Sequence, residues 1–123
     1  MSYDFTYPVI AFSIAGWVKE AASASDLTDA SPNDDLAGWQ GLVIYDASGH
    51  RYTARRTFRR WPRSNLGARL CRILGISIHV GFDLTNPEPT PLEELKSRVE
   101  GFYGRSPLFT AASDHRAVIE LCL

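Results

Sequence analysis

The stretch GLVIYDASGHRYTARRTFRRW, residues 41–61, has the pattern of a β-hairpin, and the remaining elements can be arranged around it. Its first half is a β-branched and aromatic run, after which Asp46 and Gly49 stand at the first and fourth positions of a turn. This spacing is typical of a type I turn whose glycine takes a positive φ as a G1 bulge. We therefore expect a strand, a tight turn, and a return strand that begins at His50 or Arg51.

The return strand has one apolar and one polar face, because side chains alternate across a strand. The parity expected to face the core holds Tyr52, Ala54 and Phe58. The opposite parity, expected to face water, holds Arg51, Thr53, Arg55, Thr57 and Arg59. Arg56 and Arg60 break the pattern, since they share the apolar parity. Either a bulge displaces them, or Arg56 lies at the core edge with a carboxylate partner, because an unpaired buried guanidinium is too costly.

The composition is that of one ordinary globular domain, residues 1–123, with 45% hydrophobic and 22% charged residues. Cys71 and Cys122 are too few for a disulfide framework, and their apolar neighbours predict buried free thiols in a reducing compartment. The chain shows neither a signal-peptide pattern nor an apolar run long enough for a membrane span. A cytoplasmic protein without a membrane partner is expected.

Charge is distributed unevenly along the chain. Residues 1–46 carry seven acids and one Lys, a net charge of −6. Residues 47–82 carry eight Arg and no acid, a net charge of +8, and residues 83–123 carry seven acids and four bases, a net charge of −3. Arginine is favoured for bidentate anion contacts and for protein interfaces alike. The middle segment therefore predicts a basic surface without identifying what it binds.

Two further strands flank the hairpin in sequence. Residues 8–19 (PVIAFSIAGWVK) read as one long strand that is apolar on both parities and covered on both sides, with Gly16 as a candidate bulge. Residues 76–84 (ISIHVGFDL) alternate cleanly, which predicts an antiparallel strand with one buried face.

Four helices are expected. Ser31-Pro32 starts a short helix that ends at Gly38 and turns Leu36 and Trp39 inward. The second is capped by Ser64 or Asn65, closed by Gly75, and expected to bury an apolar face made of Leu66, Leu70, Ile73 and Leu74. The third has Thr90 and Glu93 in a capping box and an apolar stripe of Leu92, Leu95, Val99 and Phe102. Ser113 caps the last helix, whose apolar end predicts docking on its own domain or on a second copy as a homodimer.

These elements predict an α+β fold with an antiparallel sheet of about four strands. Two or three helices are expected to pack mainly on one face of that sheet.

The arginine-rich strand and the loop after it carry the candidate binding residues: Arg51, Arg55, Arg59, Arg63 and Trp61. Arginines with interleaved aromatics suit a protein partner, and in the alternative they bind a phosphate backbone and stack bases. The bland interpretation is a solvated strand edge. No motif typical of an RNA- or DNA-binding module accompanies them.

No catalytic or metal-binding motif stands out. The spacing of Asp26, Asp29, Asp34 and Asp35 fails the EF-hand pattern, and none of the three histidines has a second ligand at zinc spacing. Phosphate-loop, dinucleotide and nucleophile-elbow patterns are missing too. We therefore expect no cofactor and no metal, and an enzyme has no positive support.

One layout resembles that of small bacterial α+β proteins, some of which are immunity proteins that neutralise toxins. The resemblance lies in a strand with a Trp, the DxxGxRY hairpin that contains Asp46 and Arg51, and the PLEELKSRV helix over residues 91–99. It implies a non-enzymatic protein that acts through a charged surface complementary to a partner. A small interaction module, immunity-like in the sense of this resemblance, is thus the function expected first, and a nucleic-acid-binding domain is second.

Overall fold

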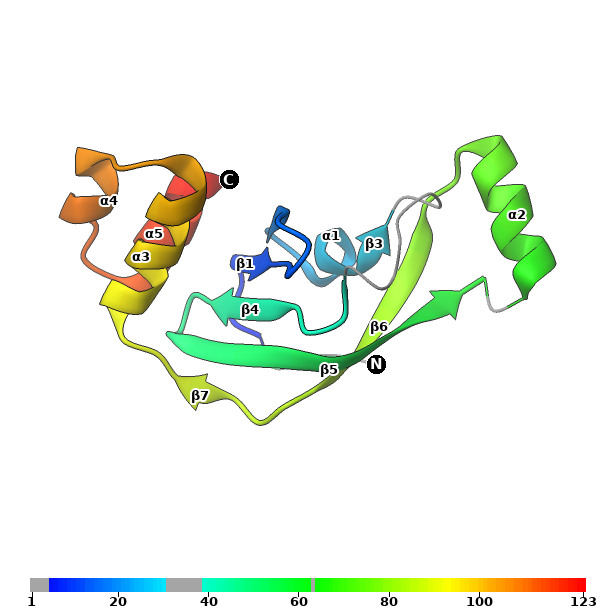
Figure 1. The fold of residues 1–123 in the computed structure, drawn as a ribbon, viewed down its shortest axis with the longest axis horizontal. Coiled ribbons are helices and arrows are strands. Elements are labelled where there is room, and N and C mark those ends of the chain that lie inside the picture. Colours follow the sequence, from blue (N-terminus) through cyan, green and yellow to red (C-terminus); the bar gives the residue numbers. More distant parts are fainter. Residues whose placement is uncertain (1–4, 31–38, 63) are drawn as a thin grey trace.

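The computed structural model describes residues 5–30, 39–62 and 64–123, and it confirms the α+β class with an antiparallel sheet (Figure 1). The strands are β1 (Val9–Phe12), β2 (Val18–Ala21), β3 (Asp29–Ala30), β4 (Val43–Asp46), β5 (His50–Trp61), β6 (Ile78–Leu84) and β7 (Glu88–Pro89). The helices are α1 (Ala24–Thr28), α2 (Asn65–Leu74), α3 (Leu92–Tyr103), α4 (Pro107–Ala111) and α5 (His115–Cys122). Within the described residues the sheet thus has seven strands rather than about four.

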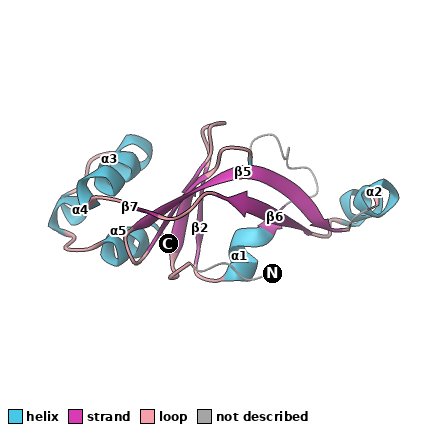
Figure 2. Cartoon of the chain, turned by 90° about the horizontal axis from the view of Figure 1, so that it is seen from below, coloured by secondary structure: helices cyan, strands magenta, loops and turns pink. Residues whose placement is uncertain are grey.

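The strands hydrogen-bond in the order β2-β1-β4-β5-β6-β3, and β7 pairs with β5. The long strand β5 lies between β4 and β7 over its first residues and pairs with β6 over the remainder. It curves through the middle of the molecule, and α2 lies beyond its far end (Figure 2).

The predicted hairpin is confirmed as β4 and β5. Gly49 has a φ of 90°, as the G1 bulge requires, and its N–H donates to the carbonyl of Asp46. The buried Asp46 carboxylate organises the turn, because its Oδ1 accepts from the backbone N–H groups of Ser48 at 3.1 Å and His50 at 3.0 Å. Its Oδ2 accepts from Thr6 N–H at 3.2 Å, so the buried charge is satisfied by backbone donors.

The single long strand expected over residues 8–19 is wrong, since the chain forms the hairpin β1–β2 there. Gly16 lies in the turn with a φ of 94°, a backbone conformation that glycine adopts without strain, and it is not a bulge within a strand. The expected burial of both faces is confirmed for β1. Val9 and Ala11 enter one core cluster, while Ile10 and Phe12 enter the other.

Those two clusters lie on opposite faces of the sheet, and three of the described helices pack on one of them, as expected. One cluster joins the sheet to α1 through Leu27 and includes the buried Trp39, which faces inward as expected. The other joins the sheet to α3, α4 and α5 through Leu95, Val99, Phe109, Val118 and Ile119. The sheet is therefore covered by different helices on its two sides.

Two irregularities in the pairing of β5 with β6 decide where the arginines point. The register shifts between Ala54 and Arg56 and again between Arg59 and Trp61, which are the bulges that the parity break of Arg56 and Arg60 suggested. Each bulge moves the following side chains to the other face. The expected water-facing Thr57 is therefore buried, and Phe58 lies on the outer face opposite Gly81.

Gln40 covers the edge of β5 where β4 ends. Its side-chain Nε2 donates to the carbonyl of Thr57 at 3.0 Å, and its Oε1 accepts from Thr57 N–H at 3.2 Å. The Thr57 hydroxyl donates to the carbonyl of Trp39 at 2.9 Å, so this buried polar residue is satisfied. One glutamine side chain thus replaces a neighbouring strand at that point.

Helix ends follow the sequence signals with small shifts. Ser64 caps α2 and Gly75 closes it in the left-handed conformation, as expected. α3 has Pro91 rather than Thr90 at its N-cap and runs through Gly101 to Tyr103, and the cap of α5 is Asp114 rather than Ser113. The helix expected after Ser31 lies outside the described residues.

Truncating a side chain on a buried face of the sheet should cost much more stability than truncating one on the exposed face of α2. Leu95→Ala removes a fully buried side chain, so we expect it to lower the free energy of unfolding by about 2–5 kcal/mol. Leu74→Ala removes a side chain that is 68% exposed, so its cost should stay within about 0.5 kcal/mol. Urea unfolding followed by circular dichroism measures both. Equal losses would show that the apolar face of α2 is covered within the monomer.

Candidate functional site

The helix α2 presents its large aliphatic side chains to solvent, contrary to the buried face expected from the sequence. The exposed fractions are 69% for Leu66, 50% for Leu70, 78% for Ile73 and 68% for Leu74. Contiguous exposed apolar patches are typical of interaction sites, whereas scattered single residues are not. We call the exposed face formed by these four residues, with Arg69 and Arg72, the α2 surface.

Small residues on the opposite side of α2 explain this orientation. Cys71 is buried in the core cluster around β6, and its carbonyl accepts from Ile76 N–H at 2.9 Å where the helix ends. Gly67 lies so close to the preceding loop that an added Cβ would be 2.9 Å from both Pro62 Cβ and Ser64 Oγ. A larger residue cannot occupy that contact, so the bulky side chains are left on the outside.

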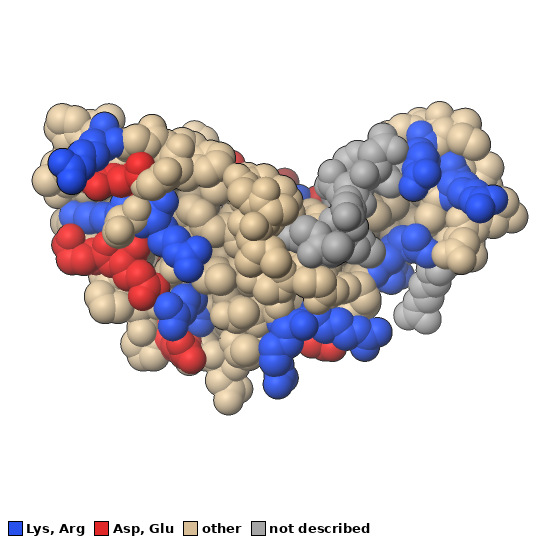
Figure 3. Space-filling model, in the orientation of Figure 1, with Lys and Arg blue, Asp and Glu red and all other residues tan. Residues whose placement is uncertain are grey.

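The α2 surface is also basic. Arg69 and Arg72 are exposed on this helix, and residues 47–82 contain no Asp or Glu. Figure 3 shows basic side chains over α2 and the neighbouring end of the sheet, whereas acidic and basic residues are mixed over the α3–α5 end. On this face, the basic surface predicted from residues 47–82 is therefore present at the α2 end of the molecule.

Arg51, the first of the candidate binding residues, is engaged inside the molecule. Its Nη2 lies 2.5 Å from Glu88 Oε2, and its Nη1 lies 2.9 Å from Glu94 Oε2. Glu94 also accepts from the Tyr45 hydroxyl at 3.0 Å. The Glu88 hydrogen bond is the main reason that the pKa of Arg51 is raised, while burial and then the Glu94 hydrogen bond raise the pKa of Tyr45.

The other candidates lie on different parts of β5. Arg55 is exposed at the first bulge, and Arg59 pairs in register with the core residue Val80 and donates to Asn65 Oδ1 at 3.1 Å. Trp61 is 50% exposed at the end of the strand, and Arg63 lies outside the described residues. Arg51, Arg55 and Arg59 therefore do not form the single face that strand periodicity predicts, because the bulge at Arg55 separates them. Their binding role remains a prediction.

Arg56 is exposed, which answers the question that the sequence left open. Its Nη1 lies 3.9 Å from Asp83 Oδ2, and its guanidinium carbon lies 5.4 Å from the centre of the Phe58 ring. Both side chains of the ion pair are more than half exposed, so the pair adds little to stability.

A small polar pocket that sequence spacing did not reveal lies beside Trp61. Its volume is about 320 Å³, and it is lined by Thr28, Arg60, Trp61 and His79. The antiparallel pairing of β3 with β6 places Asp29 opposite His79, with Asp29 Oδ1 2.8 Å from His79 Nδ1. The two residues are fifty positions apart, so only the pairing of β3 with β6 could have revealed them. We call this the Trp61 pocket.

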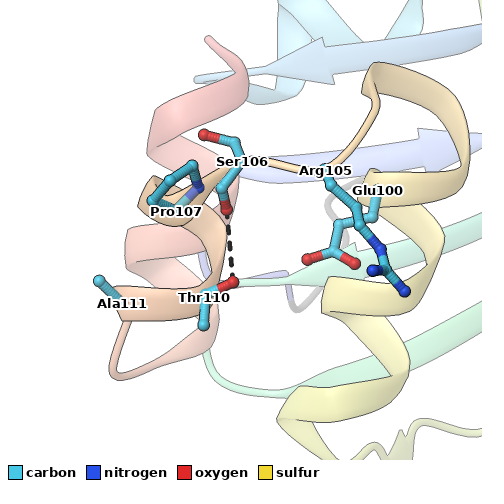
Figure 4. A pocket seen from close by; sticks show the side chains of 6 residues that line it. All are labelled: Glu100, Arg105, Ser106, Pro107, Thr110 and Ala111. Atoms are coloured by element: carbon cyan, nitrogen blue, oxygen red, sulfur yellow. Dashed lines mark hydrogen bonds between the residues drawn. The ribbon is translucent and has the colours of Figure 1, made fainter.

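Two broader hollows lie on the α3–α5 end. The larger, about 580 Å³, is lined by Glu100, Arg105, Ser106, Pro107, Thr110 and Ala111 (Figure 4). The other, about 370 Å³, lies between α4 and α5 and has Leu108 and Leu121 among its lining residues. Both of these leucines are exposed, which leaves the predicted docking of the C-terminal helix on a second copy as a proposal.

The thiols and the remaining histidines show structural roles. Cys122 is half-buried rather than buried, and burial raises the pKa of its thiol to about 11. His115 Nε2 donates to the carbonyl of Thr90 at 2.8 Å, and His50 Nδ1 contacts the Ser48 hydroxyl at 2.8 Å. In the described part of the chain, no three His, Cys, Asp or Glu side chains gather as metal ligands. None of the described helices has the length and apolar character needed to cross a bilayer.

Comparisons of the chain with protein-family models, with curated proteins and with solved structures found no match. The site must therefore be interpreted from its own geometry.

Because Arg51 forms ion pairs within the molecule, its substitution should cost more stability than that of Arg55. Arg51→Gln breaks two ion pairs at a half-buried position, so we expect it to lower the free energy of unfolding by about 1 kcal/mol. Arg55→Gln changes an exposed residue on the same strand and should stay within about 0.5 kcal/mol. Chemical unfolding of both variants measures this. An unchanged Arg51→Gln protein would show that Arg51 is available to a partner.

The raised pKa of Cys122 predicts a thiol that reacts slowly. In a Cys71→Ala background, the native alkylation rate should rise about tenfold per pH unit until pH approaches 11, since only the thiolate reacts. The same protein unfolded in urea should level off near the ordinary thiol pKa of 9.0. Mass spectrometry of iodoacetamide adducts follows both. A native plateau at pH 9 or below would contradict the burial of this thiol.

Proposed function

We propose that the chain is a non-enzymatic protein-interaction module that docks through the α2 surface onto an acidic partner with an apolar groove. The observation that carries this proposal is the outward-facing aliphatic face of α2 beside Arg69 and Arg72, in a segment without acidic residues. An amphipathic helix laid into a groove is a recurrent mode of protein recognition.

Charge complementarity favours an acidic partner over other occupants. The α2 surface is flanked by arginines, so a partner with carboxylates at its rim gains attraction during encounter and excludes basic competitors. Arginine and tryptophan are common in the energetic centres of interfaces, and half-exposed Trp61 lies on the strand that leads into α2. The resemblance in sequence layout to immunity proteins is consistent with a role in which the partner is occluded, and this role stays a prediction. The free thiols support a cytoplasmic site of action.

A nucleic-acid-binding domain on the same strand is the second candidate, and the geometry favours it less. Phosphates are tracked by a continuous row of cations along one groove. On β5 the bulges distribute the arginines over two faces, and Arg51 is neutralised by Glu88 and Glu94. An enzyme is supported less still. Among the described residues, the groups with shifted pKa values are Tyr45, Arg51 and Cys122, and they line none of the three pockets described above.

Capture from a native lysate of the source cell, with nuclease added, tests the proposal when it is paired with matched variants. We expect the tagged wild-type chain to capture one protein in stoichiometric amount. With Ile73→Ser, the amount of that protein captured should fall at least tenfold. Leu108→Ser changes another exposed apolar residue, 64% exposed against 78% for Ile73, at the other end of the molecule and should leave capture unchanged. The Arg69→Glu/Arg72→Glu variant should slow association with the purified partner, and added salt should slow wild-type association in the same way.

Three results would contradict the proposal. Equal capture by wild-type and Ile73→Ser protein would exclude the α2 surface. Recovery of nucleic acid, with the captured proteins lost on nuclease treatment, would favour the second candidate. If the chain bound anionic vesicles without a protein partner, and this binding required Ile73, the helix would be assigned to a membrane surface instead.

A further inference from the structure

The Trp61 pocket has a chemical character different from that of the α2 surface. Its lining residues come from α1, β5 and β6, so the pocket exists only in the folded chain. It combines a cation, Arg60, with an aromatic ring that is half exposed, Trp61. Its volume of about 320 Å³ is at the lower end of the range for small-molecule sites, about 300–1,000 Å³.

The backbone is arranged so that Arg60 can reach this position. Arg60 is the extra residue of the second bulge, and its side chain crosses Gly81. An added Cβ on Gly81 would lie 2.7 Å from Arg60 Cδ and 2.7 Å from Phe58 Cε2. Among the described residues, no carboxylate lies at ion-pair distance from Arg60. With respect to these residues, the guanidinium can therefore pair with an anion.

The other two lining residues offer acceptors. His79 lines the pocket with its Nδ1 2.8 Å from Asp29 Oδ1, and a neutral imidazole ring always keeps one nitrogen that accepts. The Thr28 hydroxyl donates to the carbonyl of Ala24 at 3.0 Å, so its lone pairs remain for a ligand. A ligand that fits the pocket therefore has an anionic group, a planar ring and hydrogen-bond donors.

We propose that the Trp61 pocket binds a nucleotide with an amino-bearing base. Arg60 pairs with the phosphate, Trp61 stacks on the base, and Thr28 and His79 accept from the exocyclic amino group. The Lys19 ammonium, which donates to the Asp29 carbonyl, adds positive charge nearby. A free mononucleotide and an unpaired nucleotide of a single strand share this chemistry. Apart from Trp61, the residues that line this pocket take no part in the proposed docking by the α2 surface.

Calorimetric titration of the whole chain tests this with AMP as the main probe and UMP, adenosine, inorganic phosphate and a short oligoadenylate for comparison. We expect millimolar or tighter binding of AMP, and several-fold weaker binding of UMP, adenosine and phosphate. Trp61→Ala removes the ring on which the base stacks, so it should lower the affinity for AMP by about tenfold. Arg60→Gln should remove the difference between AMP and adenosine, and Thr28→Val should reduce the preference for AMP over UMP.

Matched controls separate this site from the α2 surface. Arg55→Gln and Ile73→Ser should bind AMP as the wild type does, and thermal unfolding confirms that each variant is folded. If oligoadenylate binds more tightly than AMP, the ligand is an unpaired nucleotide within a single strand. If the two bind equally, the ligand is a free mononucleotide. No AMP binding, equal AMP and UMP binding by a folded wild type, or binding of phenylalanine instead of AMP would each overturn the proposal.

Discussion

The fold depends on β5 pairing with different partners along its length. Its first residues lie between β4 and β7, whereas its remaining residues pair with β6 on one side and rely on Gln40 where β4 has ended. Buried backbone groups must be paired, so a strand of twelve residues needs partners throughout. Two bulges let the strand bend between these partners. The positions of the surface arginines follow from this solution for the backbone.

Local sequence signals identified most of the elements, because they depend on neighbouring residues alone. The turn at Asp46 and Gly49 and the cap and closing glycine of α2 were predicted from residue types at fixed spacing. The hairpin at Gly16 was missed since strand periodicity continues across it. The position of a bulge depends on the partner strand, which a single stretch does not contain. Strand alternation therefore predicted that Thr57 faces water and that Arg59 lies on the same face as Arg51. Both predictions are wrong, because the first bulge shifts the alternation of the residues that follow it.

The α2 helix shows a second limit of the sequence pattern. Periodicity establishes that the helix is amphipathic but not which side meets the rest of the domain. The close approach of Gly67 to Pro62 and the burial of Cys71 give the small residues the inner position. The Trp61 pocket was invisible for a similar reason, because Asp29 and His79 meet only through the pairing of β3 with β6. Residues joined by tertiary pairing alone could not be recognised as a site in advance.

The charge distribution bears on which surfaces can act together. Two copies packed through α2 would bring Arg69 and Arg72 of each chain into one contact, with no carboxylate from residues 47–82 to balance them. Self-association through α2 is therefore disfavoured by charge repulsion, whereas the binding of an acidic partner is not. The α3–α5 end carries both signs of charge and exposes Leu108 and Leu121. A second copy, if one binds, therefore fits the C-terminal end. This leaves α2 accessible to the proposed partner, because the two ends are separated by the length of β5 (Figure 1).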